Sequence, residues 1–109
     1  MASPFASQPE FFSSDAALTC VAEYFALRSD PTRLHVLALL CRSKEGLTVS
    51  EIVSKSGIRQ PNVSRHLRRL YAAGVLTRKR SRTSVVYSVT DSLIDQICDI
   101  VYRHVDREQ

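Results

Sequence analysis

The first half of the chain carries apolar residues at helical spacing. In residues 15–29 the apolar stripe consists of Leu18, Val21, Ala22, Phe25 and Ala26. Steps of three and four residues are typical of an amphipathic helix. A second helix is expected from Asp30-Pro31 to about residue 42, because an acidic cap before proline is a strong start signal. Its apolar residues cover most of its circumference, which predicts the central buried helix of the fold.

Two shorter helices follow. Thr48 to Glu51 has the form of a capping box, in which the two side chains accept hydrogen bonds from each other's amides. The helix that begins there should end near residue 56, since Gly57 can adopt the left-handed conformation of a tight turn. The next helix is predicted from Gln60-Pro61 to about residue 73, before Gly74.

The period of the pattern then changes. Segments 75–80 and 84–89 carry β-branched residues on both sides of a polar turn, which predicts an antiparallel hairpin. A last helix should follow, capped by Thr90 or Asp91. Its expected apolar stripe is Leu93, Ile97, Ile100, Val101 and either His104 or Val105. Residues 1–12, rich in Pro, Ser and Ala, are predicted to be a flexible arm.

These elements predict a single domain over residues 13–107, mainly α with a small antiparallel β-hairpin. Two short helices joined at a glycine turn and followed by a hairpin describe a winged helix-turn-helix. A chain of 109 residues is long enough for one modest core of this kind.

Charge is concentrated in one part of the sequence. Residues 52–90 hold nine basic residues and no acidic one, although the whole chain has a formal net charge of only +4. A field of one sign costs self-repulsion unless an anionic partner relieves it. Nucleic acid is the leading candidate, because the segment does not form one long amphipathic helix that would suit a membrane surface. No apolar run approaches the length of a membrane span, and residues 1–15 lack the features of a secretory signal, so we expect a cytoplasmic protein.

The helix over residues 60–73 has two distinct faces. At about 100° per residue, Val63, Leu67 and Leu70 share one sector and should face the core. Arg65 and Arg68 point nearly opposite, and Asn62, Ser64 and Arg69 lie on the flanks. Such a helix fits a DNA major groove, where Arg can pair with guanine, Asn with adenine, and Ser with base or phosphate. Near the hairpin tip, Arg78, Lys79, Arg80 and Arg82 should contact the DNA backbone or the adjacent minor groove.

Three motifs carry a resemblance to a known family. The segments "LRSDPTRLHVLALL", "LTVSEIVSKSGIRQPNVSRHLRRLYAAGVLTRKR" and "VVYSV" make residues 20–105 similar to the ArsR/SmtB family of small bacterial repressors. The resemblance implies a homodimer, paired through the first and last helices, that represses by blocking promoter DNA. With the hairpin residues, it leads us to predict these DNA-binding residues: Gln60, Pro61, Asn62, Ser64, Arg65, His66, Arg68, Arg69, Arg78, Arg80 and Arg82.

The histidines can be interpreted as structural residues as well as binding residues. His66 borders the apolar face of its helix, so packing against the core and contact with phosphate are equally open for it. His35 is expected to be half-buried and structural. No metal or other cofactor is expected, because the two metal sites of the family are degenerate here. Thr48 and Ser50 stand where one site has cysteines. In the other, Asp91 and His104 match, but Leu93 and Arg107 replace ligands.

Three cysteines, Cys20, Cys41 and Cys98, are too scattered for a disulfide scaffold or a CxxC motif. Their apolar helical contexts favour small buried core residues. Some relatives in the family couple a cysteine of the second helix to one of the last, so a redox switch between Cys41 and Cys98 is an alternative. Cys20 and Cys98 are a further possible pair.

The sequence points away from enzymes. It shows no paired nucleophile and base, no phosphate-binding loop and no carboxylate dyad in a plausible cleft. The interpretation that remains is a homodimeric repressor that binds an inverted-repeat operator and is released by an effector or a redox signal. The alternative is a winged-helix protein-interaction module without specific DNA binding.

Overall fold

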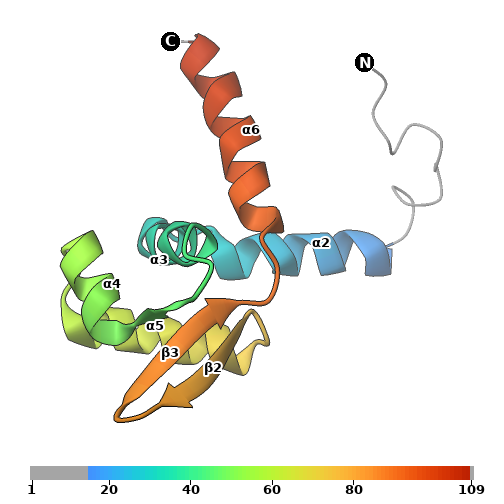
Figure 1. Ribbon diagram of the computed structural model, residues 1–109. Coiled ribbons are helices and arrows are strands. Elements are labelled where there is room, and N and C mark those ends of the chain that lie inside the picture. Colours follow the sequence, from blue (N-terminus) through green and yellow to red (C-terminus); the bar gives the residue numbers. More distant parts are fainter. Residues whose placement is uncertain (1–14, 109) are drawn as a thin grey trace. The chain divides into compact units, whose positions relative to one another are not determined.

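A computed structural model describes residues 15–108, so the predicted arm of residues 1–12 lies outside the described residues. The chain divides into two compact units, with the boundary between Asp30 and Pro31 (Figure 1). The described part of the first unit is the helix α2 (Asp15–Arg28), which contains no buried residue. Within it, the Arg28 guanidinium lies 3.6 Å from the centroid of the Tyr24 ring. The predicted stripe exists, but Leu18, Val21 and Phe25 remain exposed.

The second unit contains the other predicted elements in the predicted order, with one addition. Its helices and strands are α3 (Pro31–Cys41), β1 (Leu47–Thr48), α4 (Val49–Ser56), α5 (Gln60–Ala72), β2 (Leu76–Ser81), β3 (Ser84–Val89) and α6 (Leu93–Glu108). The addition is the two-residue strand β1. The mainly helical fold with a small antiparallel sheet confirms the predicted winged helix-turn-helix class.

Helix α3 is central to the second unit, as its apolar pattern predicted. It contacts α4, α5, β3 and α6, and its Val36, Leu37 and Leu40 are at most 1% exposed. Burial on this scale is the dominant favourable term in folding. The prediction for His35 on this helix was wrong, because its side chain is exposed rather than half-buried.

The sheet has the order β1-β3-β2, so β3 is its middle strand. Strand β1 pairs with β3 through Leu47 and Thr48, opposite Tyr87 and Val86. Gly46, just before β1, lets the backbone come close to strand β3. It has φ +83°, and a Cβ built there would lie 2.5 Å from both the Tyr87 carbonyl oxygen and Ser88 Oγ. Only glycine fits this backbone conformation and this spacing without displacing β3.

The predicted capping box of α4 is confirmed. Thr48 Oγ1 accepts a hydrogen bond from the Glu51 amide at 3.2 Å, and Glu51 Oε1 accepts one from the Thr48 amide at 3.0 Å. The bonds from Thr48, backbone first, lower the pKa of Glu51 from its usual value. At the other end Gly57 is left-handed, with φ 74°, and its amide donates to the Val53 carbonyl at 2.9 Å. The turn between α4 and α5 is therefore set by local sequence.

Of the two predicted caps for the last helix, the structure selects Asp91. Its Oδ1 accepts a hydrogen bond from the Leu93 amide at 2.9 Å. Thr90 instead donates through Oγ1 to the Val75 carbonyl at 2.9 Å, which ties the end of β3 to the start of β2.

The apolar stripe predicted for α6 lies mostly open in a single chain, with Ile97 half-buried. Ile94, which was absent from the predicted stripe, is 5% exposed and anchors the helix. The stripe residues Leu93, Ile100, Val101 and Val105 are each at least 44% exposed. An amphipathic helix whose apolar face stays open in one chain has an unfilled surface for packing. None of the described helices is long and apolar enough to cross a membrane.

Candidate nucleic-acid interface

Helix α5 has the two faces that its sequence predicted. Val63, Leu67 and Leu70 are completely buried, whereas Arg65, Arg68 and Arg69 are exposed. The buried residues fix the rotation of the helix, because turning it would bring apolar side chains into water. The arginine side is thus held toward solvent by the core rather than by contacts of its own.

The remaining predicted contacts of α5 lie near its start. Gln60, Pro61 and Asn62 are exposed, and Ser64 is half-buried. His66 is 8% exposed, so of its two readings the structure favours packing against the core. A role of His66 in contacting DNA stays a prediction that its burial does not support.

The hairpin presents its basic residues beyond the core. Strand β2 pairs with β3 in an unbroken register, from Leu76 opposite Val89 to Ser81 opposite Ser84. Side chains alternate along a strand, so Arg78 and Arg80 share the face of the buried Leu76, and Lys79 lies on the opposite face. All three basic side chains are exposed.

One contact joins the hairpin to α5. The guanidinium carbon of Arg78 lies 4.1 Å from the centroid of the Tyr71 ring. A guanidinium over an aromatic face is held by the ring quadrupole, with about 0.5–1 kcal/mol at exposed sites. Tyr71, which is 38% exposed near the end of α5, was not among the predicted functional residues. Its position four residues after Leu67 did not indicate a functional role, because the contact with Arg78 depends on the turn that leads from α5 into β2.

At the tip of the hairpin, Arg82 has φ 58°. It is the first residue of the two-residue turn between Ser81 and Ser84. Positive φ costs a residue with a Cβ about 1–2 kcal/mol, which glycine would avoid. A basic side chain thus stands at a position where the backbone alone favours glycine.

The positive charge of this surface is not neutralised within the chain. Within residues 15–106, no ion pair involves an arginine or lysine of α5 or the hairpin. On α6, by contrast, Arg103 pairs with Asp99 at 3.1 Å. An acid-free segment cannot supply local partners. From elsewhere in the chain, Glu45 lines a surface hollow together with Lys79 and Arg80 but forms no ion pair with either. The surface is therefore complementary to a polyanion.

The comparisons with known proteins agree with this geometry. The sequence model of a family described as "Bacterial regulatory protein, arsR family" matches residues 30–78. Over 98 residues the chain is 30% identical to a transcriptional repressor SmtB homolog of Synechocystis sp., covering 90% of this chain and 72% of that protein. The chain belongs to the ArsR/SmtB family of transcriptional regulators.

Other relatives of this family extend the comparison. A probable mercury resistance operon repressor of Streptomyces lividans is 36% identical over 80 residues, which are 73% of this chain and 60% of that protein. The crystal structure of the transcriptional repressor BigR from Xylella fastidiosa has a TM-score of 0.72 at 25% identity, covering 82% of this chain and 89% of that one. The ArsR/SmtB family consists of regulators rather than enzymes, which confirms the expected absence of a catalytic role.

The cysteines differ from the first interpretation, in which all three were buried. Cys20 is exposed, and Cys41 and Cys98 are half-buried. The pKa of Cys41 is raised, first by burial and then by the negative charge of Asp95, and Cys98 also contributes. A raised pKa disfavours the thiolate, which is the form that reacts with oxidants. Burial and the charge of Asp95 therefore favour the neutral thiol at Cys41.

Proposed function

We propose that the chain is a homodimeric repressor that binds an inverted-repeat operator with two copies of α5. The observation that supports this most directly is the arginine face of α5, which has no acidic partner and is continuous in charge with the hairpin. Recognition helices of such dimers lie about one helical turn of DNA apart, ~34 Å. The proposed operator accordingly has two half-sites with that spacing.

DNA binding is tested by titrating purified protein against duplexes selected from a random pool. We expect a recovered inverted repeat, and an affinity that falls steeply with salt, with a slope of about −0.9 for each phosphate contact. Replacing Arg65 with Ala should cost roughly 1–3 kcal/mol and relax base preference in each half-site. Lys44→Ala removes an exposed positive charge outside α5 and the hairpin, and should bind as the native protein does.

The proposed dimer uses α2 and α6. It is supported by the exposed apolar residues of each helix, which include Phe25 on α2 and Ile100 on α6, the latter 67% exposed. Ile100→Glu should shift the molecular mass measured by light scattering toward the monomer and weaken operator binding. Gln96→Glu adds the same charge at an exposed polar position of α6 and should leave the dimer intact. A native dimer with Ile100→Glu would exclude this face.

Release by an effector or by oxidation completes the proposal, with no metal required. The raised pKa of Cys41 argues against a fast thiolate reaction there, so we favour a bound effector. Operator titrations with reductant and with peroxide or polysulfide separate the two routes. A loss of DNA binding on oxidation that disappears in Cys98→Ser would establish the redox route instead, and Cys20→Ser tests the other pairing.

The alternative function, a winged-helix interaction module, needs a strongly acidic protein partner to match residues 52–90. It predicts no preference among random duplexes, together with capture of a protein that survives nuclease treatment. The same selection experiment therefore decides between the two functions.

A further inference from the structure

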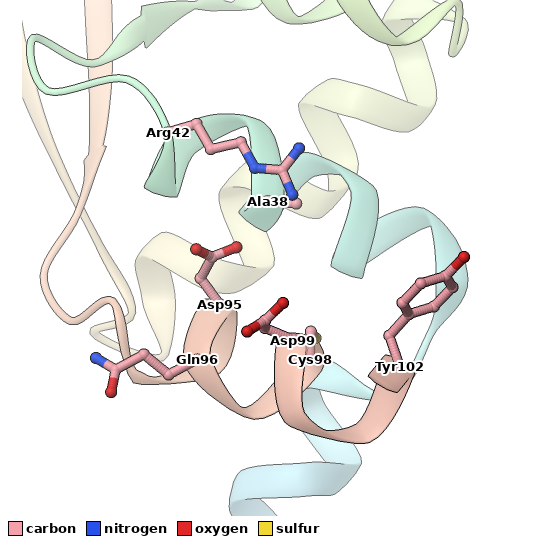
Figure 2. Close-up of a pocket in the computed structure, with 7 residues that line it drawn as sticks. All are labelled: Ala38, Arg42, Asp95, Gln96, Cys98, Asp99 and Tyr102. Carbon is pink, nitrogen blue, oxygen red and sulfur yellow. The ribbon is translucent and has the colours of Figure 1, made fainter. Parts of the chain in front are cut away.

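A pocket of about 360 Å³ lies between the end of α3 and α6 (Figure 2). Its walls include Ala38 and Arg42 on one side and Asp95, Cys98, Asp99 and Tyr102 of α6 on the other. This volume falls within the usual range for small-molecule sites. The DNA-binding residues proposed above take no part in it, so it requires an explanation of its own.

The pocket has opposite charges on its two sides. Figure 2 shows the Arg42 guanidinium extending toward the same space as the carboxylates of Asp95 and Asp99. Among residues 15–106, no ion pair joins Arg42 to either carboxylate. Asp95 is half-buried, and it lies close enough to the half-buried Cys41 to help raise the pKa of that thiol. A half-buried carboxylate and an unbridged guanidinium face each other across the pocket.

These charges restrict what can bind. A simple anion attracted to Arg42 would be repelled by two carboxylates, and a simple cation would meet the guanidinium. A metal ion needs several converging ligands, and the described residues contain no group of three His, Cys, Asp or Glu that could hold one. A molecule with an anionic and a cationic group on separate atoms would satisfy both sides at once.

Asp99 can still bind a ligand cation, although it forms an ion pair with Arg103. Its partner Arg103 lies at 3.1 Å, but the two side chains are 57% and 70% exposed. Exposed pairs of this kind contribute little, so a ligand cation can share or replace Arg103. The Tyr102 ring and the Ala38 and Cys98 side chains also line the pocket and supply apolar surface, which suits methylene groups.

We infer that the pocket between α3 and α6 binds a small zwitterion of the amino-acid class, with its anionic group on Arg42 and its cationic group on Asp95 and Asp99. The same pocket connects α6 to α3, the helix that contacts α4, α5 and β3. A role as the effector site rests on the proposed function, because it requires that α6 and DNA binding are coupled. Binding of the zwitterion itself does not rest on it.

The test is an amide chemical-shift titration of the full chain without DNA. The probes are glycine, β-alanine, γ-aminobutyrate and δ-aminovalerate, which increase the separation of the two charges in steps. Butylamine and butyrate serve as probes with one charge. We expect at least one zwitterion to saturate shifts centred on Ala38, Asp95 and Cys98, with a dissociation constant of about 1 mM or tighter, while the singly charged probes do not.

Substitutions test which side chain binds each charged group of the ligand. Arg42→Gln and Asp95→Asn should each weaken binding by about tenfold or more, the loss of one charge-assisted contact. Lys44→Gln and Asp106→Asn remove the same charges at exposed positions outside the pocket and should bind as the native chain does. The dispersion of each spectrum reports folding, and either pocket variant alone can decide if the other fails to fold.

The inference would be overturned if no zwitterion gave saturable shifts, or if butylamine or butyrate gave equal shifts. Native binding by either folded pocket variant, or equal losses in the two controls, would overturn it as well. None of these outcomes depends on DNA. Operator titrations with and without the best probe then test the effector role separately, and unchanged operator affinity would remove that role while leaving the site.

Discussion

The contact between Tyr71 and Arg78 leads to a prediction about how the hairpin serves DNA binding. The Arg78 guanidinium is held 4.1 Å from the Tyr71 ring centroid, which restricts a long side chain before DNA arrives. A side chain that is already ordered loses less conformational entropy when it binds. Tyr71 is therefore expected to act as a positioning residue for Arg78.

The expected loss of operator affinity follows from the exposure of Tyr71 and Arg78. Tyr71 is 38% exposed, so the contact is worth about 0.5–1 kcal/mol, which corresponds to a change of about two- to fivefold in affinity. Tyr71→Leu, which removes the ring, should weaken operator binding by that factor. Tyr71→Phe keeps the ring face and should bind as the native protein does.

The assay is an operator titration at fixed salt, with urea denaturation to compare the stability of each variant. A double-mutant cycle with Arg78→Ala isolates the coupling. If Tyr71 acts through Arg78, then Tyr71→Leu should have no further effect once Arg78 is replaced. Tighter binding by Tyr71→Leu would refute the reasoning, because it would mean that Arg78 must leave the ring to reach DNA. An equal loss in the Arg78→Ala background would refute it as well.

Three further predictions concern stability. Gly46→Ala should lower the free energy of unfolding in urea by about 2–4 kcal/mol, because the new Cβ meets the backbone of β3 at positive φ; a native midpoint would contradict this. Arg82→Gly should raise the thermal midpoint slightly by relieving φ 58° and yet weaken operator binding. Arg82→Ala keeps a Cβ, so it should leave the midpoint unchanged while it weakens operator binding. Glu51→Gln should destabilise the protein at neutral pH. The lowered pKa of Glu51 means that the stability from its carboxylate is full above its usual 4.5 and is lost as pH falls through the lower folded value, so the two proteins should converge in acid denaturation.

Much of the basic surface proposed to bind DNA follows from local sequence. The spacing of Val63, Leu67 and Leu70 sets which side of α5 is buried, and their burial confirms it. The capping box at Thr48 and the left-handed Gly57 each depend on residues within one or two turns of the chain. On α6 the pattern did not indicate that Ile94 is the buried residue. A helix with apolar residues on more than one side can bury either side within its own chain, and its neighbours decide which.

What the sequence by itself determined was the order of elements, the turn between α4 and α5, and a basic surface without acids, since each depends on neighbouring residues or on composition. Only the tertiary structure decided the pairing of β1 with β3, the contact of Tyr71 with Arg78, and the placement of Arg42 and Asp95 around one pocket. These features join residues that are distant along the chain or separated by a turn. Their positions depend on how whole elements pack, and no periodicity within one element records that.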